Sequence, residues 1–137
     1  MVTGASRGIG LAVARALAGS GARVTAGALR SSAGLDELAA DGGVRVVEAD
    51  LADSGGPARL VGAAGDRIDI VVNNVGGAPA RTGGFLSITD EDWLASLNLN
   101  LMAAVRTTGA GECGSTRSAL GRWPRTFGSA SMASRPP

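Results

Sequence analysis

Three glycines within seven positions, followed at once by an apolar helical pattern, constrain this chain more than any other feature. They lie in the segment Thr3-Gly4-Ala5-Ser6-Arg7-Gly8-Ile9-Gly10. The apolar positions of residues 11–18 recur with helical spacing, so the glycines lie on the turn that opens a helix. A helix N-terminus presents unpaired N–H groups and the positive end of the helix dipole, and a turn without side chains lets a diphosphate approach them. The segment predicts a phosphate-binding turn, and the alternative is a glycine turn with a purely structural role.

The composition excludes several classes of function. The length of 137 residues is enough for one domain, and the net charge of +1 gives no reason to expect nucleic acid or an anionic membrane as a partner. The single cysteine, Cys113, cannot form an internal disulfide, and no run approaches the roughly 18 apolar residues that span a bilayer, so a cytoplasmic location is expected. The chain has no Tyr and no His, and its 13 basic residues are all Arg. A mechanism carried out by these 137 residues therefore cannot use Tyr, His or Lys as its proton donor.

Expected strands alternate with expected helices, which is typical of an α/β fold with a parallel sheet. Strands are predicted at residues 22–28, 44–48 and 68–72, and helices at residues 35–40, 58–64 and after Thr89. Only Met1 and Val2 precede the glycine turn, so the first strand is predicted to be a stub. We therefore expect either that the true start lies upstream or that folding is compromised.

Polar residues follow these strands, at the edge where open α/β sheets bind ligands. The first of them is Arg30. If the fold binds a dinucleotide, this position separates two cofactors, because NAD sites usually place Asp or Glu there and NADP sites use Arg. Residues 28–30 offer no carboxylate, so Arg7 and Arg30 favour NADP over NAD. The alternative is that Arg30 is a solvated loop residue.

Two further polar segments follow later strands. Asp50-Leu51 comes after residues 44–48, and Asn73-Asn74-Val75-Gly76 comes after residues 68–72. Asn amides at a strand end can tie adjacent strands together and line a ligand crevice. The alternatives are that Asp50 is a helix N-cap and that the Asn pair forms an ordinary turn.

The glycine turn resembles the cofactor loop of the short-chain dehydrogenase/reductase family, written there as Thr-Gly-x-x-x-Gly-x-Gly. The resemblance extends in order and distance from Val2 to about Thr108, through both polar segments, Trp93 and Asn100. It implies a truncated Rossmann-type doubly wound parallel sheet of about four strands with flanking helices, as a partial dinucleotide-binding domain over residues 1–108. The cofactor-binding residues that it implies are Gly4, Ser6, Arg7, Gly8, Ile9, Gly10, Arg30, Asp50, Leu51, Asn73, Asn74 and Gly76.

The same resemblance implies an NAD(P)-dependent oxidoreductase that transfers hydride between the nicotinamide and a carbonyl or alcohol substrate. Asp50-Leu51 would contact the adenine ring. Matching Trp93 to the family's Trp places the catalytic Asn on Asn100, whose backbone carbonyl would hold a water in the proton relay. Ser131 matches the position of the catalytic Ser, with a plain tail residue as the alternative. No metal is expected.

From Gly109 the resemblance fails. Residues 109–137 have no clear periodicity and are expected to form an irregular, poorly ordered tail. The family's Tyr-x-x-x-Lys does not occur, so we expect a truncated form that is inactive alone, with a non-catalytic NADP-binding or non-functional fragment as the alternative. The family's oligomer interface is expected to be absent. A reading-frame shift would produce such a segment, and resequencing the coding DNA would test this hypothesis.

Overall fold

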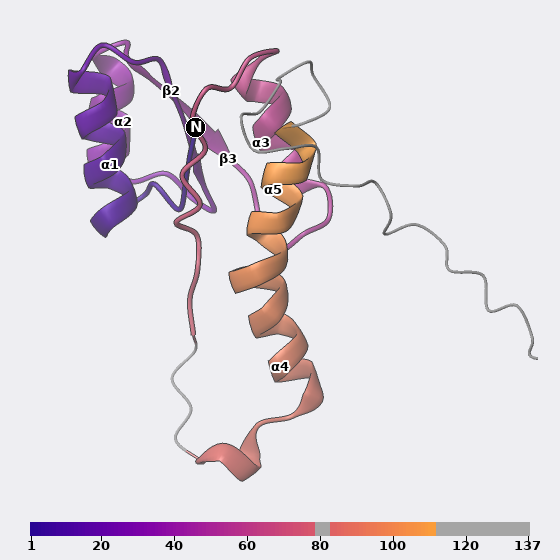
Figure 1. The fold of residues 1–137 in the computed structure, drawn as a ribbon. Helices are drawn as coiled ribbons and strands as arrows, with labels where there is room; N and C mark the ends of the chain where they lie inside the picture. Colours follow the sequence, from indigo (N-terminus) through magenta and orange to yellow (C-terminus); the bar gives the residue numbers. More distant parts are fainter. Residues whose placement is uncertain (79–82, 112–137) are drawn as a thin grey trace, which may run out of the picture.

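A parallel sheet lies between two layers of helices in the computed structural model, which describes residues 1–78 and 83–111 (Figure 1). In these residues the sheet has three strands in the order β1 (Val2–Thr3), β2 (Val24–Ala28) and β3 (Val44–Glu48). Both pairings are parallel, with Val2 opposite Ala26 and Ala28 opposite Glu48. The predicted α/β class and the predicted stub of a first strand are confirmed.

Several helices begin at start signals in the sequence, either a capping side chain or a proline in the first turn. On one side of the sheet are α1 (Gly8–Gly19) and α2 (Ala33–Ala40), and on the other are α3 (Gly56–Ala64) and α5 (Ala103–Gly111) (Figure 1). Ser32 caps α2, Pro57 lies in the first turn of α3, and Thr89 and Asp92 form a capping box on α4 (Asp90–Leu97). A 3₁₀ turn, η1 (Phe85–Ser87), precedes α4, and a π-helical turn, η2 (Asn98–Met102), joins α4 to α5. Helix α5 ends at Gly111, whereas the partial dinucleotide-binding domain was expected to end at Thr108.

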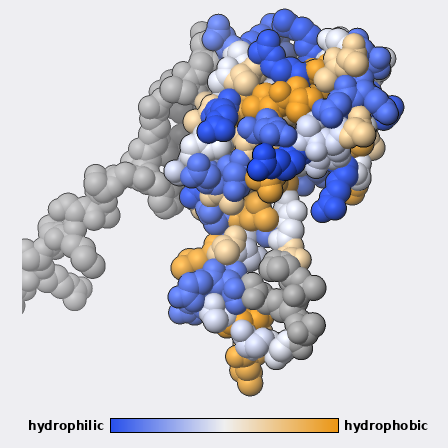
Figure 2. Space-filling model, turned by 180° about the vertical axis from the view of Figure 1, so that it is seen from behind, coloured by the Kyte–Doolittle hydropathy of each residue, from blue (hydrophilic) through white to orange (hydrophobic). Residues whose placement is uncertain are grey.

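Apolar side chains reach the surface on the protruding part of the molecule that contains η1 and α4 (Figure 2). The apolar stripe along α4 and the following helix is about half exposed, from 48% at Trp93 to 65% at Leu94. Its other members are Leu97, Leu101 and Val105. In the described part of the chain, no helix combines the length and the hydropathy needed to cross a membrane.

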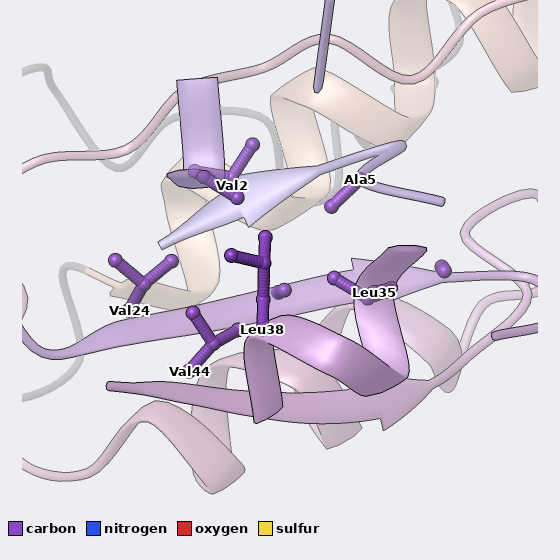
Figure 3. Packing of buried hydrophobic residues seen from close by; sticks show 9 residues of the cluster. Val2, Ala5, Val24, Leu35, Leu38 and Val44 are labelled. Carbon is purple, nitrogen blue, oxygen red and sulfur yellow. The ribbon is translucent and has the colours of Figure 1, made fainter. Parts of the chain in front are cut away.

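Two hydrophobic clusters hold the layers together, one on each face of the sheet. The first joins β-strand residues to α1 and α2, and its members Val2, Val24, Leu35, Leu38 and Val44 point toward one another (Figure 3). The second joins the sheet to α3 and α5 and contains Met1, Ala49, Leu51, Leu60 and Ala103. Successive side chains of a strand point to opposite faces, which places Met1 in one cluster and Val2 in the other.

Residues 68–72 differ from the prediction of a fourth strand. They run beside β1 but form only one isolated parallel bridge, between Val2 and Val72. The Val72 N–H donates to the Met1 carbonyl and the Thr3 N–H donates to the Val72 carbonyl, both at 2.9 Å. Because β1 has only two residues, it offers too few partners for a longer ladder. The described sheet therefore has three regular strands, and residues 68–72 occupy the position of the fourth through this single bridge.

Candidate functional site

The glycine turn connects β1 to α1 at the carboxyl edge of the sheet. Gly4 and Gly8 have φ values of 63° and 57°, which residues with a side chain rarely adopt. A Cβ atom on Gly10 would lie 2.2 Å from the Gly4 carbonyl oxygen, so the first turn of α1 packs directly on the loop. A Cβ atom on Gly8 would meet nothing within 4 Å. The turn is thus closed by packing on the Gly10 side and open on the Gly8 side.

The N-terminus of α1 lacks a side-chain cap of the kind that α2 and α4 have. Arg7 occupies the N-cap position without a side-chain hydrogen bond, and the first turn contains no acidic residue. By contrast, Ser32 and Thr89 accept hydrogen bonds from the first turns of α2 and α4. The first N–H groups of a helix have no partner within the helix, so an uncapped and open N-terminus can accept an anion. Arg7 and Ile9 beside it are exposed and Ser6 is partly buried.

Thr3 and Asn74 join the glycine turn to the end of residues 68–72. The Thr3 hydroxyl accepts hydrogen bonds from the Asn74 N–H at 2.9 Å and the Val75 N–H at 3.0 Å. The Asn74 side-chain amide donates to the Gly4 carbonyl at 3.1 Å and to the Thr3 carbonyl at 3.3 Å. Sequence reasoning placed Thr3 in the glycine motif but gave it no role; its position as the first residue of the motif was the available signal.

Asn100 and Asn73 connect the same edge to the helices behind it. The Asn100 amide donates to the Gly77 carbonyl at 2.8 Å, and its Oδ1 accepts from the Gly77 N–H at 2.9 Å. A Cβ atom on Gly76 would lie 2.8 Å from the same Oδ1. The Asn73 amide donates to the Thr108 hydroxyl at 3.1 Å. Asn100 lies within the π-helical turn η2, a feature that often occurs at functional sites.

Asp50 and Leu51 follow β3 but have different environments. Asp50 is exposed, and its Oδ1 accepts a hydrogen bond from the Ala52 N–H at 2.9 Å. The N-cap of α3 is Gly55, so Asp50 is not a helix cap. Leu51 is only 4% exposed and lies in the second hydrophobic cluster. Leu51, which was expected to contact the adenine ring together with Asp50, is therefore packed into the core.

The loop of residues 29–32, between β2 and α2, contacts the glycine turn directly. The Ser32 hydroxyl donates to the Ser6 carbonyl at 2.6 Å. Arg30 in this loop is largely exposed, and its Nη1 lies 3.7 Å from Oε2 of Glu48. Sequence reasoning did not identify Glu48, although it is the last residue of β3 and lies opposite Ala28 in the parallel register.

The residues predicted to bind a dinucleotide thus gather along the carboxyl edge of the sheet, except for the buried Leu51. An open, uncapped glycine turn, two arginines and the polar strand ends fit a nicotinamide dinucleotide. Ser131, the second predicted catalytic residue, lies outside the described residues. Within residues 1–78 and 83–111 no three His, Cys, Asp or Glu side chains are grouped so that they could hold a metal ion.

Comparisons with known proteins agree with this fold. The family model of short chain dehydrogenases matches residues 1–111. An L-rhamnose 1-dehydrogenase (NAD(P)(+)) of Azotobacter vinelandii is 40% identical over 121 residues, which cover 80% of this chain and 46% of the relative. A carbonyl reductase from Pseudomonas aeruginosa PAO1 has a similar structure, with a TM-score of 0.73 and 31% identity over 81% of this chain and 53% of that chain.

A short-chain dehydrogenase from Burkholderia cenocepacia J2315 in complex with NADP has a TM-score of 0.69 and 35% identity, covering 81% of this chain and 48% of that chain. These similarities confirm a Rossmann-type fold. The chain spans about half the length of the relatives that it matches.

Proposed function

The chain belongs to the short-chain dehydrogenase/reductase family, and from this premise we propose that it binds a nicotinamide dinucleotide along the carboxyl edge of its sheet. The observation that carries the proposal is the N-terminus of α1, which has no side-chain cap and faces open space at Gly8. The diphosphate would lie on the turn formed by Gly4, Ser6, Arg7, Gly8, Ile9 and Gly10. Asn74 would hold this turn against the neighbouring segment.

We propose NADP as the preferred cofactor. A 2′-phosphate adds negative charge next to the ribose, where NADP sites commonly place arginine. Arg7 and Arg30 are both exposed, and the contact between Ser32 and Ser6 keeps the loop that carries Arg30 beside the glycine turn. In this arrangement Asp50 would lie toward the adenine ring, and Asn73 and Gly76 toward the nicotinamide half.

The reaction to which this site would contribute is hydride transfer with a carbonyl or alcohol substrate. When bound, the nicotinamide supplies or accepts the hydride. Asn100 would orient the Gly77 segment through its two hydrogen bonds, and Ser131 would hydrogen-bond the substrate oxygen. We place this activity in the cytoplasm. A chain with a single cysteine forms no internal disulfide and therefore does not need an oxidising compartment.

A second possibility is that these residues bind NADP without catalysing a reaction. Transfer of hydride to a carbonyl needs a proton for the substrate oxygen, and the 137 residues contain no Tyr, His or Lys to supply it. Consumption of NADPH by the purified chain with a panel of ketones separates the two possibilities. Turnover well above background would contradict the non-catalytic one, and NADPH binding without turnover would support it.

The binding site itself can be tested with two matched glycine substitutions, Gly8→Ala and Gly21→Ala. Both glycines have positive φ values, 57° and 83°, and a Cβ atom on either would meet nothing within 4 Å. Each substitution should lower stability by about 1 kcal/mol through backbone strain. Only Gly8 faces the proposed diphosphate position, so only Gly8→Ala should weaken NADP binding, by roughly tenfold or more, in isothermal titration calorimetry. Equal affinities of the two variants would contradict the proposed site.

A further inference from the structure

Glu48, the last residue of β3, places a carboxylate beside the end of β2. The end of β2 itself has no carboxylate. The parallel register puts Glu48 opposite Ala28, the last residue of β2. Its Oε1 accepts a hydrogen bond from the Ser31 N–H at 2.8 Å, and its Oε2 is 3.7 Å from Nη1 of Arg30. Glu48 therefore contacts the loop of residues 29–32 through both the backbone and a guanidinium group.

This loop is fixed beside the glycine turn. The Ser32 hydroxyl donates to the Ser6 carbonyl at 2.6 Å, and the Ser31 hydroxyl donates to Oδ1 of Asp36 at 2.5 Å. The position of Arg30 relative to the turn is thus set by several short contacts. A ligand phosphate that reaches Arg30 also comes close to the charge of Glu48.

We propose that Glu48 is a specificity-determining residue that competes with the 2′-phosphate of NADP for the Arg30 guanidinium. The inference rests on the proposed function, because it assumes a dinucleotide on the glycine turn. With NAD, which has no 2′-phosphate, the Arg30–Glu48 pair stays closed. With NADP, Arg30 leaves the pair and the carboxylate faces a second anion, so Glu48 lowers the affinity for NADP and leaves the affinity for NAD nearly unchanged.

The size of the effect follows from the exposure of the pair. The side chains of Arg30 and Glu48 are 86% and 47% exposed, so solvent screens their attraction. Exposed ion pairs contribute little, and removing the carboxylate should therefore tighten NADP binding by roughly two- to fivefold. The gain should shrink as the salt concentration rises, because ions screen exposed charges over about 10 Å at 0.1 M.

The test compares Glu48→Gln with Asp66→Asn in the full chain. The glutamine keeps an oxygen that can accept from the Ser31 N–H while it removes the charge. Asp66 lines a cavity with Val24 and Val44 at the opposite, amino edge of the sheet, and its substitution changes the net charge equally. The dissociation constants of NADP and NAD are measured by titration calorimetry at low and high salt. We expect Glu48→Gln alone to tighten NADP binding, at low salt, with NAD affinity within about twofold of the original.

Three outcomes would overturn the inference about Glu48. One is an unchanged or weaker NADP affinity of Glu48→Gln, and another is an equal gain with Asp66→Asn. The third is a loss of NAD affinity in Glu48→Gln, which would mean that the carboxylate holds the ribose hydroxyl. None of these three results contradicts the proposed function. If the original chain binds neither NADP nor NAD, the inference about Glu48 and the proposed function are both overturned.

Discussion

Thr3 and Thr107 are both fully buried, but their hydroxyl groups have different partners. The Thr3 hydroxyl accepts from the N–H groups of Asn74 and Val75, whereas the Thr107 hydroxyl donates to the Ala103 carbonyl within its own helix, at 2.7 Å. Replacing Thr3 by valine keeps the shape but removes the acceptor of two partly buried N–H groups and the donor to the Val72 carbonyl, which should cost about 2 kcal/mol in the free energy of unfolding.

The matched substitution Thr107→Val removes the hydroxyl that donates to the Ala103 carbonyl. This carbonyl also accepts a backbone hydrogen bond within the helix, so the cost should stay below about 1 kcal/mol. Urea denaturation followed by circular dichroism measures both values. Equal losses for the two variants would show that the Thr3 hydroxyl contributes no more to stability than a hydroxyl bonded within its own helix.

The residues that sequence reasoning missed have their partners far away in the sequence. The glycine turn was predictable because its signal is local, a spacing of glycines before an apolar helical pattern. The roles of Thr3 and Ser32 depend on partners 71 and 26 positions away, and that of Glu48 on a residue 17 positions away. A contact across adjacent strands depends on their register, which a single sequence does not state.

Among the elements, helices α3 and α4 differ clearly in how deeply their leucine side chains are buried. Leu60 on α3 is fully buried and packs so closely on Gly27 that a Cβ atom there would lie 2.5 Å from the leucine Cδ2. Leu94 on α4 is 65% exposed. Leu60→Ala should therefore destabilise the fold by about 2–5 kcal/mol through a cavity, and Leu94→Ala by about 0.5 kcal/mol.

Thermal unfolding of the two leucine variants checks this expectation. A Leu94→Ala loss as large as that of Leu60→Ala would mean that the α4 stripe is covered in solution. The comparison also uses the same chemical change at both positions, so side-chain volume and helix propensity are matched.

Local patterns predicted elements better than they predicted contacts between elements. The strand predicted at residues 44–48 and the helix predicted after Thr89 match the structure, because a neighbouring strand and a capping side chain are present there. Residues 68–72 have a strand composition but only a two-residue partner, β1, so they form a bridge instead of a ladder. Helical periodicity gave α4 an apolar stripe, but periodicity does not tell whether another surface covers it.

At the scale of the whole molecule, β1 and the preceding Met1 join the two hydrophobic clusters and the segment of residues 68–72. Met1 packs on the α3 and α5 side, and Val2 packs on the α1 and α2 side. The Met1 α-amino group donates to the Ile70 carbonyl at 2.8 Å. Burial lowers the pKa of this amino group below its usual 8.0, and the negative charge of Asp69 offsets part of that shift.

Stability should therefore depend on pH through this one amino group. The unfolded chain binds the proton more tightly than the folded chain, so the free energy of unfolding should rise as the pH increases through the lowered pKa and level off above 8.0. The absence of His, Lys and Tyr leaves the single cysteine as the other side chain titrating in this range. The measurement, urea denaturation between about pH 6 and pH 9, is therefore made on the Cys113→Ser variant. The same variant acetylated at its N-terminus should give a flat profile, and a rise of equal size after acetylation would show that the amino group is not its source.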